Sequence, residues 1–363
     1  MEIAIHVRAR TPIWTACARP SAFFPYGHWP MWTERPIAET ADGPFDRIRP
    51  DALLSSMRWW LDAAMRALDA HVCDAPDGAR CGACVACQMF ASVTLDVTDD
   101  ATAPIPANIQ LARDGWGWNT PPARVGSFIV RLSGERDAVV RLAALLGLLE
   151  RVGGLGMRLP EGYGAFSIER DGGHLDAVIA ASSWPLAVRR RRAGDDALPD
   201  LRDIVIARCV IRPRTPGWWT HCAPLTPAAL RVQPLVLRGM APVASAIHAA
   251  WDAHMRLPLP ERRAVFGALP PHARPARVAV TWAYRDVPDD PDTPWRGPWR
   301  VHAAAWTGGL SAAIRERVVG AVADPALWAA ALGGDVDVEV GIARLDDADR
   351  VVQALRGGAL GTP

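Results

Sequence analysis

Four cysteines lie close together in the first quarter of the chain and are its strongest candidates for chemistry. They are Cys73, Cys81, Cys84 and Cys87, within fifteen residues of otherwise loop-like sequence, and the last three form two overlapping CxxC units. Thiolates in a tetrahedral array bind Zn²⁺ in closed structural sites that leave no position for a catalytic water. The spacing therefore predicts a structural zinc site with these four cysteines as ligands.

The same cysteines allow other interpretations. Cys73 stands alone instead of in a CxxC pair, and His71 could replace one of the thiolates. The thiols could also be free, or could hold an iron–sulfur cluster. A disulfide framework is disfavoured, because the total of seven cysteines is odd and the N-terminus has no apolar signal segment.

A second candidate is a glycine-rich stretch from Arg151 to Phe166, RVGGLGMRLPEGYGAF, which follows a long apolar segment. Glycines accept positive φ angles and have no side chain, so a ligand can come close to main-chain N–H groups. We expect Arg158 and Tyr163 to meet a phosphate and a base there. The glycines of this stretch are Gly153, Gly154, Gly156, Gly162 and Gly164.

Two common nucleotide-binding motifs are excluded for this stretch. The dinucleotide fingerprint would need a glycine where Leu159 stands, and it would follow a strand instead of a helix. A P-loop would need a lysine, and the chain contains none. The stretch could alternatively be an ordinary surface turn.

A third candidate lies on a predicted helix. Proline is favoured in the first turn of a helix, so the helix should begin near Pro50. Apolar residues then recur at helical spacing at Leu53, Leu54, Met57, Leu61, Ala64, Met65 and Leu68. Arg58 and either Trp59 or Trp60 lie partly off this apolar face, and Arg49 lies at the helix start, so an arginine and an indole could point at a partner. The alternative is that Trp60 belongs to the core and Arg58 is solvated.

The composition limits the class of protein. The 363 residues carry a net charge of +1, which gives no global signature of nucleic-acid binding, and all forty basic residues are arginine. Sixteen tryptophans indicate core packing with some indoles left for a flat ligand. The longest apolar stretch, from Ala138 to Val152, is too short to span a bilayer and contains Arg141. We therefore expect a soluble, cytoplasmic protein with no membrane contact.

The order of predicted elements indicates an α+β fold. Glu2 to Ala9 alternates as a half-buried strand, and the helix from Pro50 follows a long proline-rich loop that contains His28. Strand-like runs and a second helix come next, at Phe90–Val97, Ile105–Leu111, Ser127–Leu132, Glu135–Arg151 and Ala165–Glu169. This is the ferredoxin-like βαββαβ order.

The second half of the chain repeats the first. Arg8 to Ala18 (RARTPIWTACA) is echoed by Arg212 to Ala223 (RPRTPGWWTHCA), each after a strand-like run. Further strand and helix patterns then complete a second copy at Met240–Met255, Arg277–Tyr284, Arg300–Trp306, a helix from Ser311, and Val336–Ile342. We expect tandem domains over 1–185 and 201–363, joined by an arginine- and proline-rich linker at 186–200.

Four motifs in this order resemble a known family: TPIWT, IRPDALLSSMRWW, CxxCxxCQMF and GGLGMRLPEGYGAF. They are similar to the RAMP superfamily of CRISPR-associated RNA-binding proteins, and within it to the first subunits of Cmr effector complexes. The resemblance implies tandem ferredoxin-like domains and membership of a type III RNA-targeting complex with other subunits. It also implies contact with guide or target RNA through the five glycines and through Arg58, Trp59 and Trp60.

The leading functional hypothesis is a non-catalytic RNA-binding subunit that acts in antiviral defence. Arginines and loop amides would position phosphates, while aromatic side chains stack on unpaired bases. One alternative is an RNA endonuclease that uses His6, His28 or His221, although no acid–base partner stands at motif spacing. The other alternative is an assembly subunit that does not touch RNA.

Overall fold

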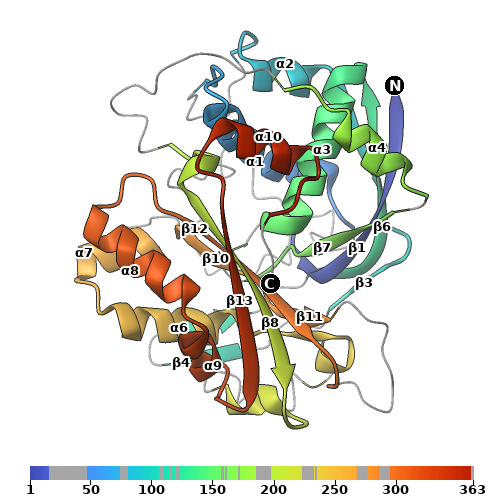
Figure 1. The fold of residues 1–363 in the computed structure, drawn as a ribbon. Coiled ribbons are helices and arrows are strands. Elements are labelled where there is room, and N and C mark those ends of the chain that lie inside the picture. The colour runs from blue at the N-terminus through green and yellow to red at the C-terminus, as the bar shows by residue number, and fades with distance from the viewer. Residues whose placement is uncertain are drawn as a thin grey trace, which may run out of the picture.

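The computed structural model describes most of the chain, and every structural statement below concerns these residues: 1–15, 47–73, 81–105, 110–113, 116–119, 123–156, 159, 162–170, 172–184, 198–222, 233, 235–267, 276–285 and 295–360. The fold is α+β and contains two antiparallel sheets of five and six strands, together with a separate two-stranded sheet (Figure 1). No helix in the described part is long and apolar enough to cross a membrane.

The first half follows the predicted βαββαβ order. Its sheet has the strand order β2-β6-β1-β7, in which all neighbours are antiparallel, and a short β3 also pairs with β6. The elements are β1 (Glu2–Ile13), α1 (Pro50–Ala67), β2 (Val93–Thr98), β3 (Thr102–Pro104), β6 (Arg124–Gly134), α3 (Arg136–Val152) and β7 (Phe166–Glu169).

The residue pattern explains the two leading elements of this half. In β1, Ile3, Ile5 and Val7 are buried and the residues between them are exposed, because successive side chains of a strand point to opposite faces. In α1, Pro50 occupies the first turn as predicted, and the buried residues recur at helical spacing. Both predictions are confirmed.

The second half repeats this arrangement. Its sheet has the order β13-β8-β12-β11-β9, with β10 also paired to β12. The elements are β8 (Ile204–Pro213), β9 (Met240–Ala241), α6 (Ala244–Met255), β10 (Val278–Val280), β11 (Ala283–Arg285), β12 (Trp299–Trp306), α8 (Ala312–Ala323) and β13 (Val336–Arg344). In the first sheet β1 lies between β6 and β7, and in the second sheet β8 lies between β12 and β13. This shared placement of the first strand is consistent with two tandem ferredoxin-like domains.

The two halves share their cores. The buried cluster of the first half also contains Ile204 and Ile206 of β8 and the C-terminal residues Val351 and Leu355. These last two belong to α10 (Ala348–Leu355), which packs against α3 and α1 (Figure 1). The chain therefore returns to the first half after completing the second sheet.

Several local expectations were wrong. The cysteine region is not all loop, because α2 (Val85–Ala91) follows Cys84 as its N-cap, and the next strand starts only at Val93. The single strand expected at 105–111 is replaced by the hairpin of β4 (Gln110–Arg113) and β5 (Trp116–Asn119). Short helices were not foreseen at α4 (His174–Ala180), α7 (Leu259–Phe266), α9 (Pro325–Ala331), η5 (Leu201–Asp203) and η6 (Trp218–His221).

Two predicted segments lie outside the described residues. They are the proline-rich loop that contains His28 and all but the last few residues of the 186–200 linker. The predicted domain boundaries stay predictions.

Acid should destabilise the second half through buried histidines. Burial lowers the pKa of His248 from its ordinary 6.5 to about 4, even though nearby Asp252 raises it. Burial and the charges of Arg208 and Arg300 lower the pKa of His302 to about 3. The unfolded chain therefore binds more protons than the folded chain as the pH falls below 6.5, so stability is lost in that window.

Replacing His248 should remove part of this pH dependence. The ring of His248 stacks on that of Trp251 at 6.3 Å between centroids, so His248→Phe keeps an aromatic ring in place. Urea unfolding between pH 7 and 4 should show a slope of ΔG against pH shallower by up to about 1.4 kcal/mol per pH unit. His254→Phe, at an exposed position of the same helix, is the control. Equal slopes in His248→Phe and the unmodified protein would contradict the assignment.

Candidate metal centre and nucleic-acid interface

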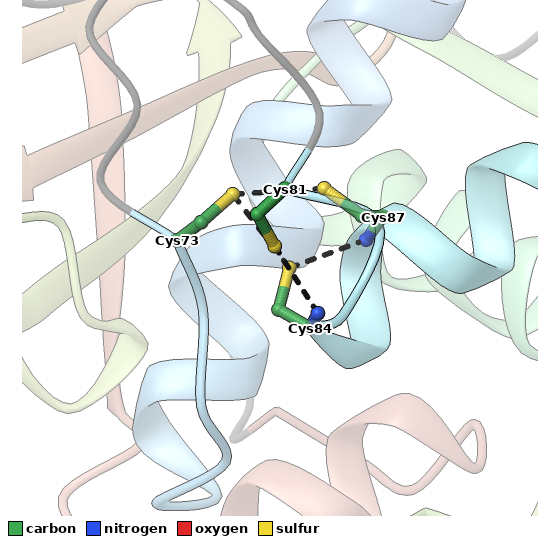
Figure 2. A group of neighbouring side chains, drawn as sticks. All are labelled: Cys73, Cys81, Cys84 and Cys87. Carbon is green, nitrogen blue, oxygen red and sulfur yellow. Dashed lines mark hydrogen bonds between the residues drawn. The ribbon is translucent and has the colours of Figure 1, made fainter.

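The four predicted cysteines converge in the structure (Figure 2). Their Sγ atoms all lie within 4.8 Å of one another, with Cys73 at 3.6 Å from Cys87 and 3.7 Å from Cys84. Four sulfurs at a zinc–sulfur distance of about 2.3 Å in a tetrahedron lie about 3.8 Å apart. The cluster is therefore positioned to bind a metal ion.

Local backbone structure positions these sulfurs. Cys73 lies just beyond the end of α1, and Cys84 caps α2, where its Sγ accepts a hydrogen bond from the backbone N of Cys87 at 3.4 Å. The Sγ of Cys81 accepts from the backbone N of Ala83 at 3.4 Å and of Cys84 at 3.2 Å. Backbone N–H groups in and after the turn before α2 thus donate hydrogen bonds to the sulfurs of Cys81 and Cys84, and such bonds stabilise thiolate ligands.

The thiols differ in their electrostatic surroundings. Burial raises the pKa of Cys87, but hydrogen bonds from Arg58 and from neighbouring thiols outweigh it, so the pKa falls to about 6. Backbone hydrogen bonds lower the pKa of Cys81, whereas burial raises that of Cys84 to about 12. Two of the four groups therefore favour the thiolate form, which binds metals.

Of the two predicted tryptophans, Trp60 lies beside the glycine-rich stretch and Trp59 packs against Trp60. Trp60 is 3% exposed and packs in the first core, while Trp59 is half-buried and contacts it edge-on at 4.9 Å between centroids. A Cβ on Gly153 would lie 2.5 Å from the Trp60 ring, so the absence of a side chain there makes room for the indole. The structure thus gives Trp60 the core role that the sequence left open.

Arg49 and Arg58 lie at separate places on the same helix. Arg49 precedes α1, its backbone N donates to Thr15 Oγ1 at 3.1 Å, and its side chain lies 3.7 Å from Asp51. Arg58 instead points to the cysteine cluster. Their predicted contacts with RNA stay predictions.

The glycine-rich stretch is packed against the end of β1. The backbone N of Gly164 donates to Pro12 O, and that of Leu155 donates to Gly164 O, both at 2.9 Å. Gly156 adopts a φ of +84°, and a Cβ there would lie 2.7 Å from Trp14 O. A Cβ on Gly154 would lie 2.8 Å from Gly164 O. Close backbone approach within the protein is therefore one reason for these glycines.

The same stretch joins the two halves of the chain. The backbone N of Trp282 donates to Gly162 O at 3.0 Å, and the rings of Tyr163 and Trp282 lie 5.3 Å apart between centroids. Tyr163 is 2% exposed, so its ring is packed against the second half. Arg158 lies outside the described residues, and its predicted role stays a prediction.

Sequence reasoning did not select a further group of four arginines, which we call the seam arginines: Arg8, Arg10, Arg208 and Arg300. Arg8 and Arg10 alternate with buried residues of β1, and Arg208 and Arg300 alternate with buried residues of β8 and β12. Arg8 is exposed and the other three are half-buried. On each strand they lie on the face opposite the buried cluster of their own half, which we call the outer face. The signal was the alternation of arginine with apolar residues in the strands.

Hydrogen bonds and strand pairing place three of these arginines near the junction of the halves. Arg10 donates to Ser167 Oγ at 2.8 Å and reaches into the second half, where its Nη1 donates to Arg285 O at 3.3 Å. The next residue back, Tyr284, pairs with Arg300 across the sheet, and Arg208 pairs with His302. Arg208 and Arg300 are therefore on adjacent strands, two residues apart in register. Burial lowers the pKa of Arg208, Tyr284 opposes this shift, and the charge of Arg300 adds to it.

The two candidate catalytic histidines that the structure describes, His6 and His221, lie in different halves of the chain. His6 is exposed on β1, whereas His221 lies in the second half, with its Nδ1 3.9 Å from Asp335. His28 lies outside the described residues.

The fold and the cysteine cluster together define an α+β protein with two antiparallel sheets and a candidate metal centre. A crystal structure of apo Cmr1 from Pyrococcus furiosus is similar over 94% of this chain and 98% of its own, with 12% identity and a TM-score of 0.35. A chain in a cryo-EM structure of type III-B Cmr-beta bound to cognate target RNA and AMPPnP is similar over 88% of this chain and 99% of its own, with 9% identity and a TM-score of 0.34.

Both structures belong to Cmr systems, the group that the sequence motifs resemble. The sequence matches no protein-family model and no curated protein. The assignment of the fold rests on the strand order of the two sheets, since both TM-scores are below 0.5.

The junction at Gly162 should be sensitive to a single methyl group. Gly162 has a φ of +93°, and a Cβ there would lie 2.2 Å from Trp282 Cδ1. Gly162→Ala should lower the free energy of unfolding by about 2–5 kcal/mol, which combines backbone strain and overpacking. Gly334→Ala, with a φ of +79° and no neighbour within 4 Å, should show the strain alone, at about 1–2 kcal/mol. Equal losses by urea unfolding would show that the contact with Trp282 is unimportant.

Proposed function

We propose that this chain is a non-catalytic, RNA-binding subunit of a type III CRISPR effector complex of the Cmr type. It would contact guide RNA, target RNA or both beside the other subunits. The observation that carries the proposal is the row of seam arginines, which runs from the outer face of the first sheet to that of the second. The motif resemblance and the tandem sheets support the same assignment.

The chemistry of the seam arginines suits an RNA backbone. A guanidinium group presents a planar fork of donors that matches the oxygens of a phosphate. Arg8 is flanked across the sheet by Ser127 on β6 and Ser167 on β7, and these hydroxyls add donors of the kind that contact phosphate and ribose. Such contacts position a strand without reading its sequence, as a guide-dependent complex requires.

The low net charge limits what the chain can do alone. Two acidic residues of β13 form ion pairs with arginines: Glu339 with Arg212 at 3.1 Å, and Asp337 with Arg214. Because the net charge of the chain is only +1, we propose that neighbouring subunits supply the rest of the RNA-binding surface.

The histidine environments support a non-catalytic role. His302 lies beside Arg208 and Arg300, but it is 7% exposed, its Nε2 contacts Tyr284 OH at 3.1 Å, and its low pKa keeps it neutral. His6 and His221 lie in different halves. No pair of described histidines is poised for general acid–base cleavage of RNA.

Removing two seam arginines should weaken RNA binding and its dependence on salt. Each phosphate contact to a single strand contributes about −0.7 to the slope of log K against log salt concentration. The double variant Arg208→Gln, Arg300→Gln should therefore lose about 1.4 from that slope and roughly tenfold in affinity at moderate salt. Fluorescence anisotropy with a labelled guide-length RNA measures both quantities.

The matched control for this experiment is Arg212→Gln, Arg214→Gln. It removes two charges from the same strand and its end, where each arginine already has a carboxylate partner. An equal loss of RNA affinity in both double variants would mean that only net charge matters. It would contradict the proposal that the seam arginines contact RNA. Specific cleavage products in the same reactions would contradict the non-catalytic role.

We further propose that the cysteine cluster holds a structural zinc ion. Four thiol ligands fill a tetrahedral site, so no position stays open for substrate. Cys84 and Cys87 also belong to the first hydrophobic core, which links the metal centre to the packing of α1 and α2. The zinc would fix the turn before α2 against the end of α1.

Loss of one exposed ligand should remove the metal and lower the melting temperature. Cys81 is exposed, so Cys81→Ser changes a ligand and little packing. We expect roughly one zinc per chain by elemental analysis, and a melting temperature lower by roughly 5–10 °C in Cys81→Ser. A strong chelator should lower the melting temperature of the unmodified protein equally and leave Cys81→Ser unchanged. Retained metal in Cys81→Ser would exclude this residue as a ligand.

A further inference from the structure

Arg58 donates hydrogen bonds to the cysteine cluster. Its Nη2 donates to Cys87 Sγ at 3.3 Å and to Cys73 Sγ at 3.6 Å. These sulfurs come from the two ends of the cluster, one beyond α1 and one in α2. A single nitrogen therefore bridges both arms of the candidate metal centre.

Two further contacts fix the position of this guanidinium group. Its Nε donates to Asp62 Oδ1 at 2.8 Å, one helical turn along α1. Its Cζ lies 5.6 Å from the centroid of the Phe90 ring, which belongs to α2. Asp62 fixes the position of Nε, and the neighbouring Nη2 is thereby directed at the sulfurs.

The charge of the candidate centre explains why a cation would be placed there. A zinc ion with four thiolates carries a net charge of −2, and a partly buried charge is costly unless it is paired. Arg58 is itself half-buried, and Asp62 supports its charged form. A fixed guanidinium group offsets part of the negative charge, and its N–H groups bond the sulfurs in the manner of other residues that support metal ligands.

We propose that Arg58 is a positioning residue of the metal centre, which holds the two thiolate arms together and balances their charge, and that it does not contact RNA. The inference rests on the proposed metal site and is independent of the seam arginines. It also explains the position of Arg58 within the RWW motif: Arg58 points at sulfur, while Trp60 packs in the core.

Metal affinity tests this role directly. Arg58→Met keeps an unbranched apolar stem about as long as that of arginine up to Nε and removes the charge and donors, while Arg58→Lys keeps a charge but loses the fork. Competition with a chromogenic chelator should show zinc affinity about 10–100-fold lower in Arg58→Met and partly restored in Arg58→Lys. Arg66→Met is the matched control, because Arg66 lies half-buried on the same helix and donates to the carbonyl of Pro199. Equal affinities in Arg58→Met and the unmodified protein would overturn the proposal.

A spectroscopic readout separates this role from a general loss of structure. Cobalt(II) substituted into the site gives sulfur-to-metal charge-transfer bands, and removal of N–H donors from the sulfurs should shift these bands to longer wavelength in Arg58→Met. Arg66→Met should leave them in place. Unshifted bands in Arg58→Met, with four thiolates still bound, would contradict the hydrogen bonds to sulfur.

RNA binding completes the test. With zinc saturating, Arg58→Met should bind RNA within twofold of the unmodified protein. A tenfold loss under these conditions would overturn the proposal in favour of direct RNA contact. A purified protein that takes up no metal would also overturn it, and this result would leave the RNA proposal intact because that proposal is measured on the seam arginines.

Discussion

The burial of α3 on every side is the constraint on which the rest of the structure depends. Eleven of its seventeen residues are buried, and a helix that is apolar all round must be covered all round. The first sheet and α1 cover part of it, and α4, α10 and β12 cover the rest. Both the second sheet and the C-terminal helix are therefore needed to complete the core of the first half. Arg151, at the last turn of α3, donates to Gly358 O and Ala354 O and so ties the helix end to the returning chain.

This constraint determines where ligand-accessible surface can exist. The outer face of the second sheet is covered near Ile204 and Ile206, which join the first core. Further along β8 the first core no longer covers this face, and Arg208 is half-exposed. The seam arginines thus mark the border between the covered and the open part of the sheet. Side chains of both halves meet at this border, as the hydrogen bond from Arg10 to Arg285 O shows, so neither half could build this surface alone.

The sequence predicted the architecture well because its patterns are local. Alternation in β1 and helical spacing in α1 and α3 follow from burial of one face or of all faces, and each pattern is read within a short window. The four sulfurs were found because zinc ligands cluster in sequence. The side-chain surroundings were not readable in the same way. Tyr163 packs on Trp282, which is more than a hundred residues away in the sequence. No local pattern shows that an aromatic ring beside glycines will be buried in a contact between the two halves.

The chain uses only arginine as its long cation, and the structure shows that one residue type can serve distinct purposes because its surroundings differ. Arg151 is deeply buried against carbonyl groups, and burial together with Arg208 and Arg170 lowers its pKa to about 10, although Glu150 opposes this. Arg58 is fixed between Asp62 and two sulfurs. The exposed guanidinium of Arg8, by contrast, stands between two serines on an open sheet face. A phosphate gains most from a cation that folding has brought into position without using its donors, so the partners of each arginine in the fold, more than the number of arginines in the sequence, decide which of them is available to an anionic ligand.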